Sequence, residues 1–170
     1  MKKVLWVVFL AVMVLMCGLM TACLTNNALS GLVTVLGNAT SSIASIEGNT
    51  GLATQIKADT AAASAAVLAW KKGSVATEAI EALNIVEDDL NLIPMTGPYV
   101  ALVDLGIGTI ESILAMLPSS TASQLHESKG TRRQVAPVHV GKWKNPESEF
   151  KDRWNAIVAK DSALASVAIK

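Results

Sequence analysis

Aromatic residues and cysteines are scarce in this chain of 170 residues. It contains four Trp, one Tyr, two Phe and two Cys. Both cysteines, Cys17 and Cys23, lie near the N-terminus, so the chain after residue 23 can form no disulfide bond. The core must therefore be built from Ala, Leu, Ile and Val, and that mixture favours helices.

The sequence also lacks the patterns that mark common catalytic and metal sites. It has no HExxH motif, no clustered-ligand spacing and no nucleophile elbow, and its two histidines, His126 and His139, are isolated. Gly106-Ile107-Gly108 is not followed by the rest of a dinucleotide fingerprint, so close helix packing explains it better. We therefore expect no enzymatic activity, no catalytic or metal-binding residue and no cofactor.

The clearest positive signal lies at the N-terminus. Lys2 and Lys3 precede an apolar run over residues 4–20, and small residues then lead to Cys23. This order of segments is typical of an export signal. The stretch 4–22 is also close to the roughly 20 residues that span a bilayer, so an uncleaved single-pass inner-membrane anchor is the alternative. Under either interpretation the rest of the chain is exported from the cytoplasm, which argues against a nucleic-acid partner.

The end of this signal, Leu19-Met20-Thr21-Ala22-Cys23, resembles the lipobox of bacterial lipoproteins, with Met20 where Leu is usual. The resemblance covers the first 23 residues only. It implies that residues 1–22 are removed and that Cys23 carries acyl chains such as palmitate, which hold the protein on a membrane. Leu24 follows the cysteine instead of Asp, which favours the outer membrane, facing the periplasm, in a Gram-negative host.

Apolar residues recur at spacings of three and four along most of the next hundred residues. This periodicity predicts four helices, over residues 27–47, 52–72, 74–93 and 98–117. Ser74 and Pro98 are expected to begin the third and fourth of them. Because the connections are short, the helices should be antiparallel neighbours. The predicted fold class is all-α, either an antiparallel helical bundle or a set of helical hairpins.

The predicted organisation has four parts: a signal peptide or apolar anchor helix (1–22), a helical bundle domain (23–118), a basic polar linker (119–145) and a C-terminal helix (146–170). Within the linker, Pro137 limits an alternating stretch to an edge strand or a polyproline segment. Asn145 and Pro146 should open the last helix, which either packs on the bundle or binds another molecule.

Two polar features of the bundle bear on function. The apolar helix over residues 98–117 carries a narrow polar strip that includes Asp104, Gly108, Glu111 and Ser112. A central bundle helix is favoured over a second membrane span there, because acidic side chains are costly in lipid. The run Glu87-Asp88-Asp89 is expected to be a solvated face.

Charge is unevenly distributed, with nine acidic and three basic residues over 47–111 but five acidic and nine basic residues over 127–170. Basic residues surround a Trp in the second region, and these are the candidate contact residues: Lys129, Arg132, Arg133, Lys142, Trp143 and Lys144. They suit an anionic membrane surface, and equally an acidic envelope protein or an anionic polymer. The alternative is a disordered, solvated linker.

The leading hypothesis is a lipid-anchored helical protein of the bacterial cell envelope with a structural or protein-interaction role and no catalytic activity. Homo-oligomers through helix packing are compatible with it. The alternative is a membrane-active protein, such as an envelope toxin or a phage lysis factor. It would perturb a bilayer through the helix 98–117 or the Trp-containing tail.

Overall fold

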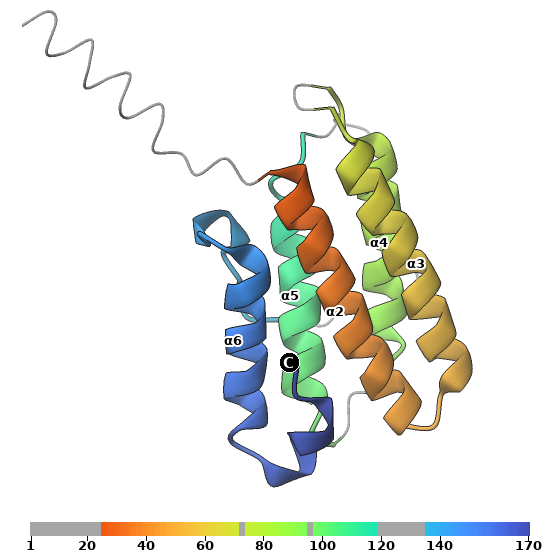
Figure 1. Cartoon of the computed structure of the whole chain (residues 1–170). Helices are drawn as coiled ribbons and strands as arrows, with labels where there is room; N and C mark the ends of the chain where they lie inside the picture. The colour runs from red at the N-terminus through yellow and green to blue at the C-terminus, as the bar shows by residue number, and fades with distance from the viewer. Residues whose placement is uncertain (1–24, 72–73, 95–96, 119–134) are drawn as a thin grey trace, which may run out of the picture.

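The computed structural model describes residues 25–71, 74–94, 97–118 and 135–170. These residues contain helices and no strand: α2 (Asn26–Ile46), α3 (Thr50–Ala69), α4 (Thr77–Asn91), α5 (Val100–Leu114), η1 (Val140–Lys142), α6 (Pro146–Val158) and η2 (Ser162–Val167). Helices α2 to α5 alternate in direction, and α6 lies alongside α2 (Figure 1). The predicted all-α antiparallel bundle is confirmed.

Local signals in the sequence set the ends of the α2–α3 hairpin. The Thr25 side chain caps α2 by accepting a hydrogen bond from the Ala28 N–H (3.2 Å). Gly48 adopts a φ of +82° just after α2, a conformation that favours glycine. The Asn49 side chain then caps α3 by accepting from the Leu52 N–H (3.0 Å). The bounds of α2 and the start of α3 lie within two residues of the predicted ones, and α3 ends at Ala69, three residues before its predicted end.

Small residues allow α2 and α3 to approach closely. Gly37 on α2 is buried, and a Cβ atom at this position would overlap the Thr60 side chain of α3. Thr60 is itself 2% exposed, and its hydroxyl group donates to the Ile56 carbonyl oxygen. Nearby, the hydroxyl groups of Ser30 and Ser64 are hydrogen-bonded across the two helices (2.7 Å).

Helices α4 and α5 begin three and two residues later than predicted. The Ser74 hydroxyl donates back to the Lys71 carbonyl oxygen (2.7 Å) and so closes a turn instead of capping a helix. Helix α4 begins at Thr77, where the preceding Ala76 N–H donates to the Pro118 carbonyl oxygen (2.9 Å). Pro98 lies in a turn, and α5 begins at Val100.

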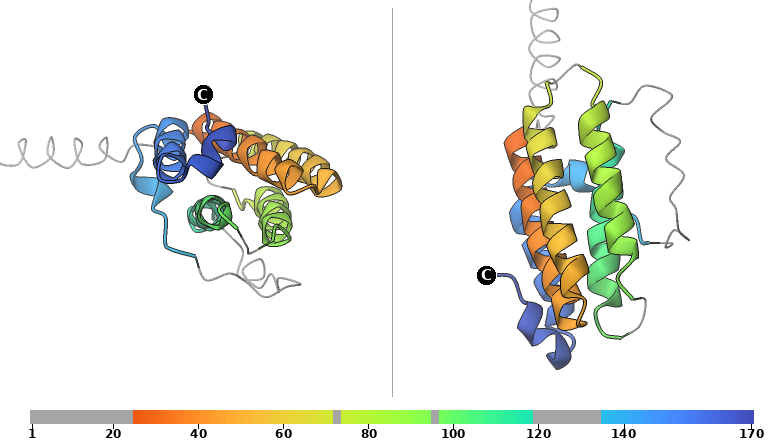
Figure 2. Two further views of the ribbon diagram at one scale, coloured as in Figure 1. Left: turned by 90° about the horizontal axis from the view of Figure 1, so that it is seen from below. Right: turned by 90° about the vertical axis from the view of Figure 1, so that its right-hand side faces the viewer.

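Helix α5 contacts α2, α4, α6 and η1, and it lies beside α4 in the left view of Figure 2. Gly106 lies close to the side chains of Thr40 on α2 and Leu90 on α4, as expected for a glycine that permits close packing. The apolar faces of the helices are mostly buried, but Trp70 and Ile157 are half-buried, and Ile46 is 47% exposed because α2 ends there.

The polar strip of α5 is covered by the described part of the predicted linker. The carbonyl oxygen of Ala136 and the side chain of Val138 lie close to Gly108. One turn further along α5, the Ser112 hydroxyl accepts a hydrogen bond from the Val140 N–H (3.0 Å). Residues 135–140 therefore pack along α5, and Val140 joins the core.

The C-terminal helix packs on the bundle, which decides between the two possibilities left open for it. As predicted, Asn145 caps α6 and Pro146 occupies its first turn. Phe150 and Trp154 are fully buried. Beyond α6 the chain turns back, and the Trp154 indole N–H donates to the Val167 carbonyl oxygen (2.8 Å).

One described helix, α2, is long and apolar enough to cross a membrane by length and composition. Here it packs against α3, α5 and α6, and 56% of its apolar window is buried inside the bundle. Burial of that kind is also typical of a core helix in a bundle.

We expect Gly37→Ala to lower the free energy of unfolding by about 1–3 kcal/mol, because the added methyl group overlaps Thr60. Adding Thr60→Ala should restore part of the loss, as urea unfolding of the single and double variants will measure. Gly51→Ala is the control, since its Cβ meets no atom closer than 3.8 Å. Equal stability of Gly37→Ala and wild type would contradict the close approach.

Candidate functional site

The structure places three of the predicted contact residues. Lys142 and Lys144 are exposed on the connection between α5 and α6. Trp143 is 3% exposed, and the Arg153 guanidinium group covers its ring at 5.1 Å from the centroid. The prediction that the Trp143 ring contacts a membrane or a partner is therefore wrong, because that ring is part of the core. Cys23, Lys129, Arg132 and Arg133 lie outside the described residues.

A tight turn explains why neighbouring side chains point in opposite ways here. The Trp143 N–H donates to the Val140 carbonyl oxygen (2.9 Å), which places both apolar side chains against the bundle. The Lys144 N–H donates to the Glu149 carboxylate (2.7 Å), and its side chain is left in solvent. The spacing of three between Val140 and Trp143 was the available signal for this arrangement.

A second candidate site lies where α2 begins. The Asn26 side chain donates to the Trp70 carbonyl oxygen, which ties the end of α3 to the first turn of α2. The Trp70 indole N–H donates in turn to the Ser74 carbonyl oxygen (3.0 Å). We call the described residues of this connection, Leu68–Lys71 and Ser74–Ala76, the α3–α4 tip.

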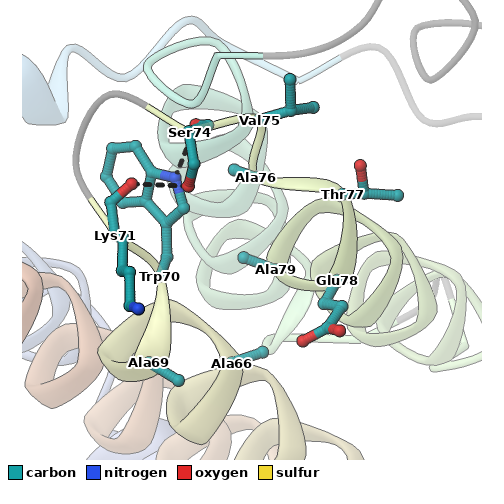
Figure 3. A pocket seen from close by; sticks show the side chains of 10 residues that line it. All are labelled: Ala66, Ala69, Trp70, Lys71, Ser74, Val75, Ala76, Thr77, Glu78 and Ala79. Carbon is teal, nitrogen blue, oxygen red and sulfur yellow. Dashed lines mark hydrogen bonds between the residues drawn. The ribbon is translucent and has the colours of Figure 1, made fainter.

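The α3–α4 tip borders an open pocket of about 390 Å³. Trp70 and Lys71 come from the end of α3, and Glu78 comes from the first turn of α4 (Figure 3). An indole ring, an amine and a carboxylate thus surround a floor of small alanines. Val75 lies at the edge of the pocket and is 52% exposed. The surface combines apolar and charged groups of both signs.

No group of three His, Cys, Asp or Glu side chains that could hold a metal ion occurs among the residues that the structure describes. His139 is exposed on the segment before η1.

The acidic run on α4 is not the solvated face that we expected. Glu87 and Asp89 are each 2% exposed, although they lie on different sides of α4, because the helix packs against both α3 and α5. The Asp89 Oδ1 atom accepts a hydrogen bond from the Gln55 side chain of α3 (2.6 Å). Its Oδ2 atom is buried and accepts no hydrogen bond within the described structure.

Burial raises the pKa of Asp89 from 3.8 to about 7, and the neighbouring Asp59 and Asp88 add to this increase. When protonated, Asp89 can donate its proton to the Asp59 carboxyl group on α3. When charged, it sits beside a second carboxylate in a desolvated position. The folded protein therefore prefers the protonated form.

Comparisons of the chain with protein-family models, with curated proteins and with solved structures gave no match.

We expect the contribution of Asp89 to stability to be complete below pH 3.8 and to be lost as the pH rises through about 7, because its pKa is higher in the folded state. Asp89→Asn keeps an acceptor for Gln55 and carries no charge. It should therefore be more stable than wild type at pH 8, by about 1–3 kcal/mol, with the difference vanishing near pH 4.

Urea unfolding at several pH values, followed by the fluorescence of the buried Trp143 and Trp154, will measure this difference. The control is Glu81→Gln, which removes an exposed carboxylate from the same helix. A difference between wild type and Asp89→Asn that stays constant with pH would refute the shifted pKa.

Proposed function

We propose that this chain is a lipid-anchored helical protein of the bacterial cell envelope with a structural or protein-interaction role. The observation that carries the proposal is the position of the N-cap of α2. Thr25 caps this helix only two residues after Cys23, the residue that the lipobox-like sequence marks for acylation. The helical body would therefore begin where the membrane attachment ends.

The short connection limits how far the body can move from the bilayer. Two residues span at most about 7 Å when fully extended. Acyl chains on Cys23 would thus hold the first turn of α2 near the lipid headgroups. An uncleaved anchor over residues 4–22 would leave the membrane at nearly the same point, so both forms of attachment orient the bundle in the same way.

The interaction role rests on exposed basic side chains. Lys142 and Lys144 are exposed, and Arg153 lies nearby over the Trp143 ring. Three cations, two adjacent to Trp143 in the sequence and one over its ring, suit an anionic partner, either an acidic envelope protein or an anionic polymer. Trp143 would contribute by holding this loop in place and not by contact with the partner.

A membrane-active function has less support. The apolar side chains of α5, including Leu102, Ile107 and Ile110, are buried beneath neighbouring helices. The bundle would have to open before they could reach a lipid bilayer. No described feature of the fold provides for such an opening.

Metabolic labelling with a radioactive fatty acid tests the anchor. We expect the wild-type chain to be labelled and Cys23→Ala to be unlabelled, because the thiol at position 23 is the proposed acceptor. Cys17→Ala is a matched control and should be labelled like wild type, since Cys17 lies within the apolar run. Equal labelling of the wild type and Cys23→Ala would reject lipidation at Cys23.

Charge substitutions test the interaction surface better than truncation does. Removing residues 119–170 would uncover the core that α6 shares with α2, so a loss of binding would have two explanations. Lys142→Gln with Lys144→Gln changes the charge alone. We expect this pair to lower crosslinked partner recovery from envelope extracts, while Lys57→Gln with Lys160→Gln should not. Equal recovery by both pairs would exclude Lys142 and Lys144 as the contact.

A further inference from the structure

We infer that the α3–α4 tip is a membrane-contacting surface that rests in the headgroup region of the bilayer to which the chain is anchored. This inference depends on the proposed membrane attachment and adds an orientation and a set of contact residues to it. It needs an attachment at the N-terminal side of α2, by acyl chains or by an uncleaved helix.

The first argument is the position of the tip relative to the attachment point. Asn26 follows Cys23 by three residues, and its side chain is hydrogen-bonded to the Trp70 carbonyl oxygen. The end of α3 therefore touches the first residue of α2. In Figure 1 and in the right view of Figure 2, the end of α3 and the start of α4 extend beyond that first turn. A bilayer at the start of α2 meets the tip.

The second argument is the composition of the tip. Leu68 and Val75 are each 52% exposed, whereas most large apolar side chains of the described structure are buried. Trp70 is half-buried, and its indole N–H is already satisfied by the Ser74 carbonyl oxygen. Lys71 is exposed beside it. An indole ring with neighbouring apolar groups and an amine is the combination that settles at a membrane–water interface.

The charges of the tip predict what kind of contact this is. Lys71 and Glu78 lie on the same pocket, so their charges largely offset each other. Lys72 follows in the sequence, so the connection between α3 and α4 carries one further positive charge. Apolar contact and the short tether would then hold the tip on the bilayer, and anionic lipid would add a small attraction to that charge.

Trp70 provides the measurement. The intact protein is purified in detergent and reconstituted into vesicles of phosphatidylcholine and phosphatidylglycerol that contain lipids brominated near the headgroup. The emission of Trp70 is the difference between wild type and Trp70→Phe, because both proteins keep Trp143 and Trp154, which are 3% and 0% exposed. Trp6, where retained, is also common to both. We expect most of the Trp70 emission to be lost to the brominated lipid, and the remainder to resist quenching by acrylamide in water.

Two substitutions give a matched control. Val75→Glu places a charge on the tip and should reduce the quenching of Trp70 by brominated lipid. Leu92→Glu changes the most exposed large apolar residue of the described structure, which lies at the opposite end of α4, and should leave the quenching unchanged. Equal quenching in the two variants would overturn the assignment of Val75 to the contact.

Flotation of the vesicles in a density gradient tests the membrane attachment of the chain separately from the contact of the α3–α4 tip with the bilayer. Protein that floats and whose Trp70 is quenched by brominated lipid supports the inference. Protein that floats but whose Trp70 is quenched by acrylamide alone overturns it, and leaves the anchor intact. Protection of Trp70 from both quenchers also overturns it, because another protein surface then covers the tip. Protein that does not float rejects the membrane attachment itself and the inference with it.

Discussion

Close approach between helices is the constraint on which this structure depends. The core contains few aromatic rings, and no cysteine follows residue 23. Contacts between aliphatic side chains must therefore hold the helices together, and small residues at the helix interfaces bring those side chains into contact. Gly37 fits against Thr60 between α2 and α3, and Gly106 on α5 lies close to Thr40 of α2 and Leu90 of α4. A Cβ atom at position 37 would overlap Thr60, and one at position 106 would be in tight contact with both neighbouring side chains. The dispersion contacts of the aliphatic core depend on that spacing.

The same close packing explains the two polar features that the structure places in unexpected surroundings. Segment 135–140 can lie against α5 because Gly108 presents no side chain there, and Ser112 supplies a hydrogen-bond partner for the Val140 N–H. Asp89 is buried because its side of α4 packs against α3, where the Gln55 side chain donates a hydrogen bond to one of its carboxylate oxygens. A buried carboxyl group with a raised pKa is the consequence of that orientation.

Much of the fold could be predicted from the sequence, since the inward faces of the helices follow from apolar spacings of three and four. The caps Thr25, Asn49 and Asn145 act within their own turns, and Asn145 was expected from the local sequence. The starts of α4 and α5 could not be predicted in this way. Ala76 bonds to Pro118, which is distant in the sequence, and Ser74 is used by a turn.

The candidate sites were less predictable, because exposure depends on which helices become neighbours. A Trp among basic residues is typical of an interface, yet Trp143 has Val140 three residues before it and fills a gap in the core. Conversely, Trp70 follows the buried Ala63 and Val67 at spacings of four and three along α3, a spacing that is typical of a core position. It is part of the α3–α4 tip because the end of α3 lies beside the start of α2 and the connection to α4 extends beyond it. The relative position of two helix ends cannot be predicted from the spacing of residues within one helix.

The α3–α4 tip and the buried Asp89 lie at opposite ends of the bundle, which limits how the protonation of Asp89 can affect the tip. The α3–α4 tip and the start of α2 lie at one end, while Gln55 and Asp89 lie toward the other, near the start of α3 and the end of α4. The helices between them are packed along their whole length. A change in the protonation of Asp89 would therefore act on the stability of the distal part of the bundle. It would reach the tip only through the common core, because no charge at the tip lies near enough to respond directly through solvent.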